Sequence, residues 1–267
     1  MVEPVAKIRP VTLADQKLIR FMVGKAEMEP IAIANDRLYW NPLVLALWLG
    51  LSSVFIEYMN WWPKPEHGVF GYLSPVPAFG TLAIAFMFAI DWLNRWDFED
   101  RSSHVLRRPD LVDVPAYYSR SPSSGFWILE YGDRFVGMIA LDASLDADVD
   151  TVVTPDTVKK DRSGKIKMTK GTSRIATIRH FYVEDPYRRV GMQDDLLDYA
   201  LAHAFSSDAM LEGVRVVESP LRKYIVETLN KHNFKVERKA ERVGALRWQN
   251  RVRILDRQQW SVARHAE

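Results

Sequence analysis

Apolar and polar positions follow two different rhythms along residues 178–205, and this stretch organises the predicted fold. Ile178 and the run Phe181–Val183 are β-branched or aromatic, which favours a buried strand. Glu184–Pro186 ends that strand, because proline cannot donate to a sheet ladder. Apolar residues then recur at helical spacing, which predicts one apolar helix face: Met192, Leu196, Leu197, Ala200, Leu201, Ala204 and Phe205.

The turn between this strand and this helix is the candidate ligand site. The first N–H groups of a helix lack an acceptor within it, and the helix dipole favours an anion there. Gly191 allows a ligand to approach the backbone closely, and Arg188 and Arg189 offer bidentate donors to phosphate oxygens. The turn therefore indicates a pyrophosphate site. An ordinary strand–turn–helix connection with surface arginines explains the same residues, so both interpretations stay open.

The remaining pattern predicts more strands and helices on both sides of this element. A helix is expected to start at Thr12, which is a plausible N-cap with Asp15 at the third helical position. Ser219–Pro220 is expected to start another helix, and residues 257–267 are expected to form a polar tail. The predicted strands are Ala6–Pro10, Phe126–Tyr131, Arg134–Leu141, Gly213–Glu218, Lys235–Arg242 and Ala245–Leu255, with Gly132–Asp133 as a hairpin turn.

Two long apolar runs, Pro42–Trp62 and Pro75–Trp96, interrupt this pattern. Each is about as long as a helix needs to be to cross a bilayer core of roughly 30 Å. Tryptophan and tyrosine residues gather at the ends of the runs, as at membrane interfaces. The two runs and the short polar turn Pro63–Gly68 therefore predict a two-helix transmembrane hairpin.

Two alternatives to a transmembrane hairpin stay open. The runs are also compatible with a pair of long buried helices, or with a protein interface, in a soluble protein. A re-entrant or surface-lying hairpin is the other alternative, because Glu57 and Asp91, together with Pro75 and Pro77, shorten the clean apolar length.

Basic residues predict the orientation of such a hairpin. The turn carries only Lys64. The flanks carry Lys25, Arg37, Arg95, Arg101, Arg107 and Arg108. By the positive-inside rule both flanks lie in the cytosol. A membrane location is therefore expected, in the endoplasmic reticulum or another endomembrane, with the rest of the chain facing the cytosol.

Composition removes several other classes of function. The chain has 267 residues and a formal net charge of +2, so no overall attraction to nucleic acid is expected. It has no cysteine, which excludes disulfides and a thiol nucleophile. Its six histidines lack metal-binding spacing, so no metal is expected, and residues 1–20 lack the apolar core of a signal peptide.

Residues 145–174 form a basic loop, either flexible and solvated or in contact with anionic lipid.

The organising element resembles motif A of the GCN5-related N-acetyltransferases, the GNAT superfamily. In that motif an apolar strand ending in valine precedes R/Q-x-x-G-x-G/A and a helix. Phe181–Val183, Arg188 and Gly191 match, whereas Gln193 stands where the family has a small residue. With the early apolar runs and the H-x-x-V sequence at His180–Val183, the chain is similar to the membrane-anchored branch of the endoplasmic reticulum, which acts on cysteine S-conjugates and lysines.

The resemblance implies an α/β (α+β) fold in which helices flank a mixed central sheet. It implies one GNAT domain over residues 1–267, with a membrane hairpin inserted at 41–97 and a basic flexible loop at 145–174. It also implies an acyltransferase that uses acetyl-CoA to acetylate a primary amine. The expected acceptor is amphipathic or membrane-associated, and the expected partners are acetyl-CoA, this acceptor and the lipid bilayer, without nucleic acid.

The resemblance also assigns site residues. The backbone of the strand is expected to bind the acetyl carbonyl and the pantetheine arm, and the turn is expected to bind the pyrophosphate. His180 or Glu184 would be the base. The acid would be water or Tyr224, because Leu229 stands where many members carry a tyrosine. The expected cofactor-binding residues are Phe181, Tyr182, Val183, Arg188, Arg189, Val190, Gly191, Met192 and Gln193.

The two departures from the family pattern support a rival interpretation. Gln193 and Leu229 are also compatible with a protein that no longer catalyses and serves as a membrane-bound interaction or regulatory subunit.

Overall fold

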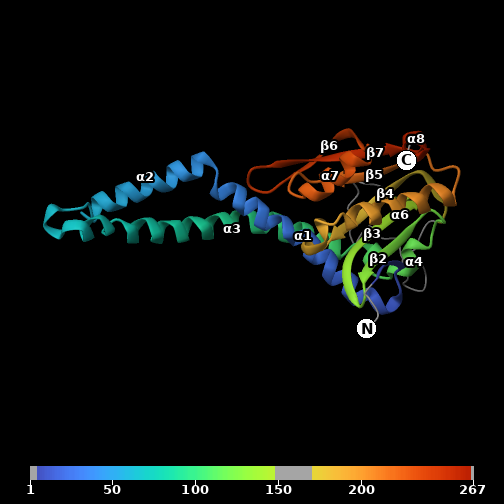
Figure 1. The fold of residues 1–267 in the computed structure, drawn as a ribbon, viewed down its shortest axis with the longest axis horizontal. Coiled ribbons are helices and arrows are strands. Elements are labelled where there is room, and N and C mark those ends of the chain that lie inside the picture. Colours follow the sequence, from blue (N-terminus) through green and yellow to red (C-terminus); the bar gives the residue numbers. More distant parts are fainter. Residues whose placement is uncertain (1–4, 148–169, 266–267) are drawn as a thin grey trace, which may run out of the picture. The chain divides into compact units, whose positions relative to one another are not determined.

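A seven-stranded mixed sheet forms the first of two units in the computed structural model, which describes residues 5–147 and 170–265 (Figure 1). This unit comprises Met1–Glu27, Arg101–Arg242 and Trp248–Glu267, and the second comprises Met28–Asp100 and Val243–Arg247. The strand order is β1-β2-β3-β4-β5-β7-β6. The strands are β1 (Ala6–Pro10), β2 (Gly125–Tyr131), β3 (Arg134–Ser144), β4 (Thr172–Val183), β5 (Gly213–Glu218), β6 (Lys235–Val243) and β7 (Trp248–Asp256).

One neighbouring pair in the sheet differs from the others in direction. Strands β1 to β4 pair antiparallel in succession, and β5 pairs antiparallel with β7. Strands β4 and β5 are parallel, and α6 (Met192–Ser207) lies between them in the sequence. A parallel pair requires such a crossover, which explains why a strand–helix–strand unit stands at the centre of the sheet.

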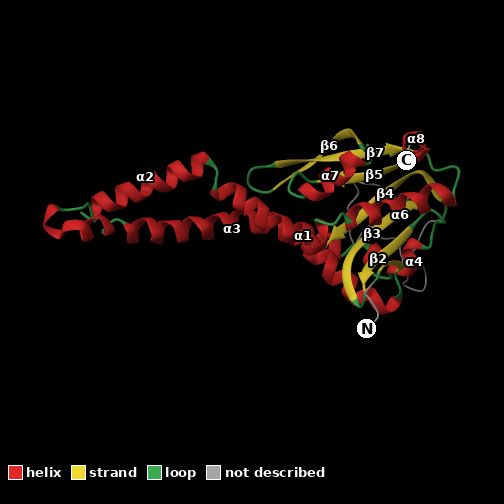
Figure 2. Cartoon of the chain, in the orientation of Figure 1, coloured by secondary structure: helices red, strands yellow, loops and turns green. Residues whose placement is uncertain are grey.

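Helices cover both faces of the sheet, as the cartoon in Figure 2 shows. On one face, α6 and α7 (Lys223–Lys231) bury Leu197, Leu201 and Leu229 against the strands. On the other face, α1 (Gln16–Tyr39) and α4 (Val114–Tyr118) contribute Ile19 and Tyr118 to a second core. The remaining short helices of this unit are η1 (Leu13–Asp15), η3 (Pro109–Leu111), α5 (Asp185–Arg188) and α8 (Arg257–His265).

Most sequence-predicted elements of this unit are present. β1 has the predicted bounds, β4 ends at Val183 as predicted, and the Asp15 carboxylate accepts bonds from the backbone N–H and the hydroxyl of Thr12. The expected strand Ala245–Leu255 was wrong at its start, because Gly244 and Arg247 have positive φ in a turn.

Three other predictions for this unit were wrong or were incomplete. The turn after β4 contains the short helix α5, which Pro186 suits at a first helical position. The polar tail is helix α8, whose Trp260 packs against Phe205. The expected basic loop 145–174 is shortened at its end by β4, which starts at Thr172, and its residues 148–169 lie outside the described part.

The second unit contains the predicted hairpin helices. They are α2 (Pro42–Tyr58) and α3 (Val76–Leu106), joined through η2 (Pro65–Leu73). α2 is shorter than the apolar run, whereas α3 extends beyond its run. The amide of Asn94 is fully buried: it donates to Asn35 Oδ1 at 2.7 Å and accepts from the N–H of Ala245 at 2.9 Å. These hydrogen bonds satisfy a polar group whose burial would otherwise be costly.

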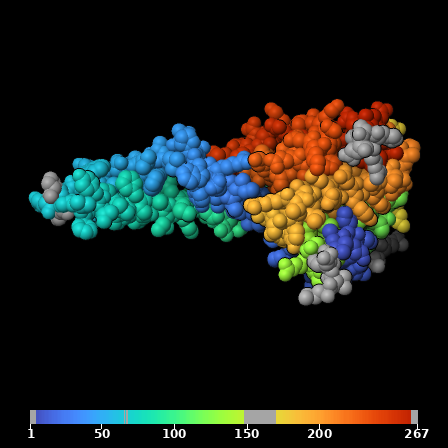
Figure 3. All heavy atoms as spheres, in the orientation of Figure 1, coloured from blue at the N-terminus to red at the C-terminus, as the bar shows by residue number. Residues whose placement is uncertain are grey.

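One helical stretch among the described residues, Gly68–Leu106, which lies mostly in the second unit, is long and apolar enough to cross a membrane. α1 and α2 would supply another only if they act as one span despite a 60° bend between them. Large apolar side chains of α2 and α3 lie on the surface, with Leu43 79% and Phe88 75% exposed. The space-filling view in Figure 3 shows these two helices in cyan to teal.

A substitution at Gly137 tests the packing of β3 against the end of β4. A Cβ atom at this glycine would lie 2.8 Å from the carbonyl oxygen of Tyr182 and 2.9 Å from Val183 Cγ2. We expect Gly137→Ala to lower the free energy of unfolding by about 1–3 kcal/mol, as overpacking does. Chemical denaturation followed by circular dichroism measures this change.

Gly24→Ala, in α1 of the same unit, is the matched control. Its Cβ would lie 3.5 Å from Leu106, an ordinary contact, so we expect a gain of roughly 0.5–1 kcal/mol. Equal effects of the two alanines would contradict the packing described here.

Candidate functional site

The parallel strands β4 and β5 separate after four paired residues. Their register runs from Ile175 opposite Gly213 to Ile178 opposite Val216. Beyond this point β5 continues in its pairing with β7 to Glu218, and β4 continues in its pairing with β3 to Val183. In the described part of the chain, no strand pairs with residues 179–183 on the β5 side. One edge of β4 is therefore open in the middle of the sheet.

Backbone groups of Phe181 and Val183 point towards this open edge. The N–H of Glu184 donates to Val136 of β3 at 2.8 Å. Because successive residues of a strand direct their backbone groups to opposite sides, Tyr182 also bonds towards β3, and Phe181 and Val183 bond away from it. Buried backbone donors and acceptors need partners, so this edge is suited to an extended ligand that carries amide groups.

The start of α6 supplies a second set of backbone donors. Gly191 precedes the helix in the left-handed region, with φ of 81°, where a side chain would be strained. The N–H of Asp194 bonds back to Gly191. Those of Met192 and Gln193 have no hydrogen-bond acceptor among the residues that the structure describes. Arg189 and Val190 are exposed next to them, so the predicted anion site has free amides and a nearby cation.

Arg188 takes a different position from the one predicted for it. Its Nε donates to the carbonyl of Val183 at 2.8 Å, and its guanidinium lies 3.9 Å from the ring centroid of Tyr224 and 5.7 Å from that of Tyr182. The structure thus brings four of the predicted site residues together around the end of β4. The guanidinium occupies one backbone acceptor of the open edge.

Gln193 is turned inwards at the start of α6. Its side chain is buried and its Nε2 donates to the carbonyl of Arg188 at 3.1 Å. Its Oε1 is also buried and has no hydrogen-bond partner within the described part of the chain. An unpaired buried amide oxygen is costly, so this residue holds the turn at the expense of an unsatisfied acceptor.

A bulge in β4 places two consecutive polar side chains on the same face of the sheet. Ala140 pairs with His180 and Leu141 pairs with Ile178, so Arg179 is the extra residue. Such a bulge re-aims side chains. Arg179 Nε donates to Asp142 at 2.7 Å, and His180 Nε2 lies 2.8 Å from Asp110 Oδ2.

Asp110 fixes the tautomer of His180. The burial of this carboxylate raises its pKa, but the hydrogen bond from His180 and the nearby charges of Arg179 and Arg108 lower it to about 2. An ionised carboxylate only accepts hydrogen bonds, so Nε2 of His180 carries a proton. The lone pair then lies on Nδ1 when the ring is neutral. The hydroxyl of Tyr118 also donates to Asp110, at 3.0 Å.

Glu184 and Glu27 each lie beside a cation. Both carboxylate oxygens of Glu184, the predicted alternative base, are bonded by Lys25 Nζ at 2.6 and 2.8 Å. Glu27 accepts from Arg222 at 2.9 Å. Burial raises the pKa of Glu27, but the charge and hydrogen bond of Arg222 and the charges of His180 and Arg108 lower it below its ordinary value. The prediction of Glu184 as a base stays a prediction.

Several of these residues were not foreseen from the sequence. No site residue was predicted near Asp110, and Glu27 lies on α1, far from His180 along the chain. A usable signal was Pro109, which suits the first position of a short helix. This helix is η3, and Asp110 is buried in it. Among the described residues, no group of three or more histidine, aspartate or glutamate side chains is arranged to hold a metal ion.

Solved structures with some likeness to this chain are acetyltransferases. The ribosomal-protein-S5-alanine acetyltransferase of Vibrio fischeri is 10% identical, with 96% of this chain and 94% of that one covered, at a TM-score of 0.45. A GNAT-family acetyltransferase of Streptococcus pneumoniae is 13% identical, with 52% and 70% covered, at 0.38.

A third likeness is to Arabidopsis thaliana NAA60 in complex with a bisubstrate analogue, at 12% identity, 50% and 75% coverage and a TM-score of 0.36. No protein-family model and no curated protein matches the sequence. TM-scores below 0.5 do not establish a shared fold. The GNAT resemblance therefore stands on the sequence motif and on the geometry at β4 and α6.

Acid unfolding tests the buried Asp110–His180 pair. Since the folded-state pKa of Asp110 lies below its ordinary value of 3.8, ionised Asp110 stabilises the fold above about pH 4, and this contribution is lost as the pH falls towards 2. We expect a loss of about 2 kcal/mol over this range in the unmodified protein, and the loss should be absent in Asp110→Asn. The free energy of unfolding, measured at each pH, gives the difference.

Asp133→Asn, in the exposed hairpin turn, serves as the control and should leave the pH dependence unchanged. A pH profile shared by Asp110→Asn and the unmodified protein would show that the pair does not stabilise the ionised carboxylate.

Proposed function

We propose that this protein is an acetyl-CoA-dependent N-acetyltransferase that acts on a primary amine of an amphipathic or membrane-associated acceptor. The observation that carries the proposal is the open edge of β4 over residues 179–183, next to the free amides at the start of α6. Together they offer partners for the two chemical parts of coenzyme A, its amide-containing arm and its pyrophosphate.

The pantetheine arm fits the open edge as an added strand would. Each amide of the arm has an N–H that needs an acceptor and a carbonyl that needs a donor, and an unpaired strand edge presents both. Val183 and Phe181 still have N–H groups to offer, although Arg188 holds the carbonyl of Val183. One of these N–H groups would also stabilise the oxyanion that forms on the acetyl carbonyl.

The pyrophosphate fits the start of α6. The amides of Met192 and Gln193 and the dipole of a sixteen-residue helix favour an anion there. Arg189 adds a mobile positive charge, because its side chain is exposed and has no partner in the described part of the chain. The negative charge of Asp194 repels the pyrophosphate only in part, because Lys231 Nζ donates to its carboxylate at 2.7 Å.

In the proposed reaction the free amine attacks the thioester carbonyl. The C–N bond forms, the C–S bond breaks, and the amine proton passes to a base. His180 can take that proton at Nδ1, because Asp110 holds its Nε2–H. The departing thiolate takes a proton from Tyr224, whose ring lies beside the end of β4 under the Arg188 guanidinium, or from water.

A catalytically inactive, membrane-bound interaction or regulatory protein is the second candidate. The specific observations in its favour are the buried side chain of Gln193 and the bond from Arg188 to Val183, which fill part of the proposed cofactor site. Acetyl-CoA binding with turnover supports the enzyme, and the absence of binding at millimolar acetyl-CoA supports this candidate.

The proposal includes a membrane location for the second unit. Its support is the exposed apolar surface of α2 and α3 and the stretch Gly68–Leu106, which is long and apolar enough to cross a membrane. With the basic flanks described above, this favours an endomembrane such as the endoplasmic reticulum, with the sheet-containing unit in the cytosol.

Calorimetric titration with acetyl-CoA tests the proposed function. We expect binding with a Kd in the range of about 1 µM to 1 mM that is usual for enzyme substrates. Arg189→Ala should weaken it about fivefold to tenfold by removing one phosphate contact, without a change in thermal stability. Turnover can be followed as released thiol, since the chain has no cysteine to contribute background.

Arg134→Ala, at another exposed arginine of the same unit, is the matched control and should bind as the unmodified protein does. Equal weakening by both alanines would mean that Arg189 acts only through net charge.

Flotation with phospholipid vesicles tests the membrane part. We expect the full chain to float with vesicles of phosphatidylcholine, and Phe88→Asp to reduce the recovered fraction severalfold, because a charge on a lipid-facing position is costly. Val236→Asp, at an exposed apolar position of β6, should float like the unmodified protein. If Phe88→Asp floats with the vesicles to the same fraction as the unmodified protein, α3 is not part of the membrane-binding surface.

A further inference from the structure

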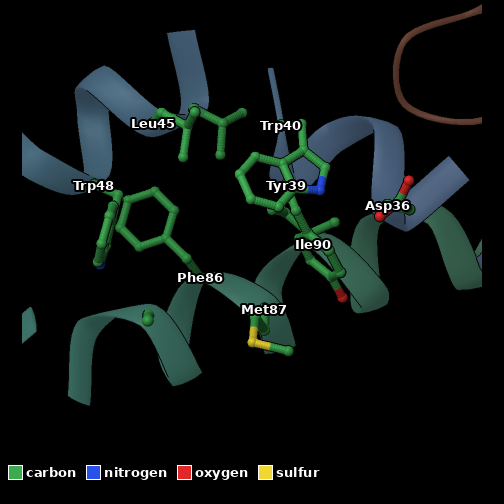
Figure 4. Close-up of a pocket in the computed structure, with 10 residues that line it drawn as sticks. Asp36, Tyr39, Trp40, Leu45, Trp48, Phe86, Met87 and Ile90 are labelled. Atoms are coloured by element: carbon green, nitrogen blue, oxygen red, sulfur yellow. The ribbon is translucent and has the colours of Figure 1, made fainter. Parts of the chain in front are cut away.

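The second unit carries an open, surface-accessible cavity that the proposed reaction does not use. It has a volume of about 440 Å³ and is lined by residues from the end of α1, from α2 and from α3 (Figure 4). This size falls within the range of small-molecule sites. Most of the lining is aromatic or aliphatic: Tyr39, Trp40, Val44, Leu45, Trp48, Ala83, Phe86, Met87 and Ile90.

One charged side chain, Asp36, is part of this lining. Figure 4 shows it at one end of the group, with Trp48 at the other. No hydrogen bond or ion pair reaches its carboxylate from the residues that the structure describes. By contrast, the nearby carboxylate of Asp91 is bonded by Asn35 at 3.0 Å and by Arg95 at 2.7 Å. Asp36 is therefore an exposed carboxylate at the rim of an apolar cavity, without a protein partner among the described residues.

The hydroxyl of Tyr39 lies in the same polar region. Burial, together with the negative charges of Asp91 and Asp36, raises the pKa of Tyr39 above its ordinary value. Because the hydroxyl stays protonated, it remains a donor and an acceptor at neutral pH. The cavity thus combines an anionic and hydrogen-bonding end with an apolar remainder.

We propose that this cavity binds a single-chain primary amine, with its ammonium on Asp36 and its alkyl chain among Trp40, Trp48 and Phe86. Charge selects the headgroup: a carboxylate without a partner attracts a cation and repels a fatty acid. The rings of Trp40 and Tyr39 add favourable cation–π surface near the same end. The alkyl chain gains from leaving water for an aromatic lining.

This inference names a ligand class for the second unit, and binding alone establishes it. Only the further statement, that such an amine is also the acetyl acceptor, rests on the proposed function. A failed acetyl-CoA titration would remove the acceptor role and leave the binding site intact.

Quenching of tryptophan fluorescence by a brominated ligand tests the site, because Trp40 and Trp48 line it. The full chain is held in phosphatidylcholine nanodiscs and titrated separately with bromododecylamine, bromododecanol and bromododecanoic acid. We expect the amine to reach half-maximal quenching at a concentration about tenfold lower than the alcohol, since a hydrogen bond to a charged group is stronger than one between neutral groups. The acid should bind more weakly than the alcohol.

Variants then locate the effect. Asp36→Asn keeps the shape of the side chain and should abolish the preference for the amine over the alcohol. Glu66→Gln, at an exposed acid of η2 in the same unit, should keep that preference. The combined change Trp40→Phe with Trp48→Phe should remove the saturable part of the quenching, with circular dichroism confirming the helices in each variant. Equal binding of amine and alcohol, or a preference that survives Asp36→Asn, would overturn the proposal.

Discussion

The separation of two parallel strands is the constraint on which the candidate site depends. β4 and β5 pair only from Ile175 to Ile178, and beyond that point each pairs only with its other neighbour, β4 with β3 and β5 with β7. A sheet interior normally satisfies every backbone group, so an opening at its centre is costly unless something fills it. The crossover helix α6 begins beside the same opening, which is why free strand groups and free helix amides occur together.

A buried polar layer maintains the geometry on one face of that opening. The bulge at Arg179 turns this side chain and His180 towards the face covered by α1 and α4, where Asp142 and Asp110 receive them. Both carboxylates are buried. Asp142 accepts hydrogen bonds from Tyr117 and Arg179. Asp110 accepts from Tyr118 and His180 through Oδ2, whereas its Oδ1 has no partner in the described part of the chain, so these donors offset part of the cost of burying the charges. Because Asp110 holds Nε2–H of His180, the lone pair of the neutral ring lies on Nδ1. The hydrogen-bond network, and not His180 alone, determines which ring nitrogen can accept a proton.

Short-range pattern predicted the elements better than it predicted their partners. The strand–turn–helix element, the β2–β3 hairpin and the Thr12–Asp15 cap follow local rules of periodicity, turn chemistry and capping, and the structure contains all three. Arg188 contacts Tyr224, which lies on α7. Because α7 begins thirty-five residues after Arg188, the local pattern around Arg188 does not encode this contact. The pairing of Asp110 with His180 and that of Glu27 with Arg222 join segments far apart in sequence, and no periodicity in one segment encodes such a contact.

The length of α2 limits how the second unit can meet a bilayer. Its seventeen residues extend about 26 Å, which is a few Å short of a core of about 30 Å. α3 has thirty-one residues, but the Asp91–Arg95 ion pair interrupts its exposed apolar surface, which includes Phe88 before the pair and Trp92, Leu93 and Trp96 within and after it. The exposed side chains of Val69 and Phe70 in η2 extend the apolar surface between the two helices. Under the proposed membrane location, α2 is the arm that limits the depth of insertion: a hairpin that spans the membrane would require local thinning of the bilayer around it, whereas a re-entrant hairpin would not.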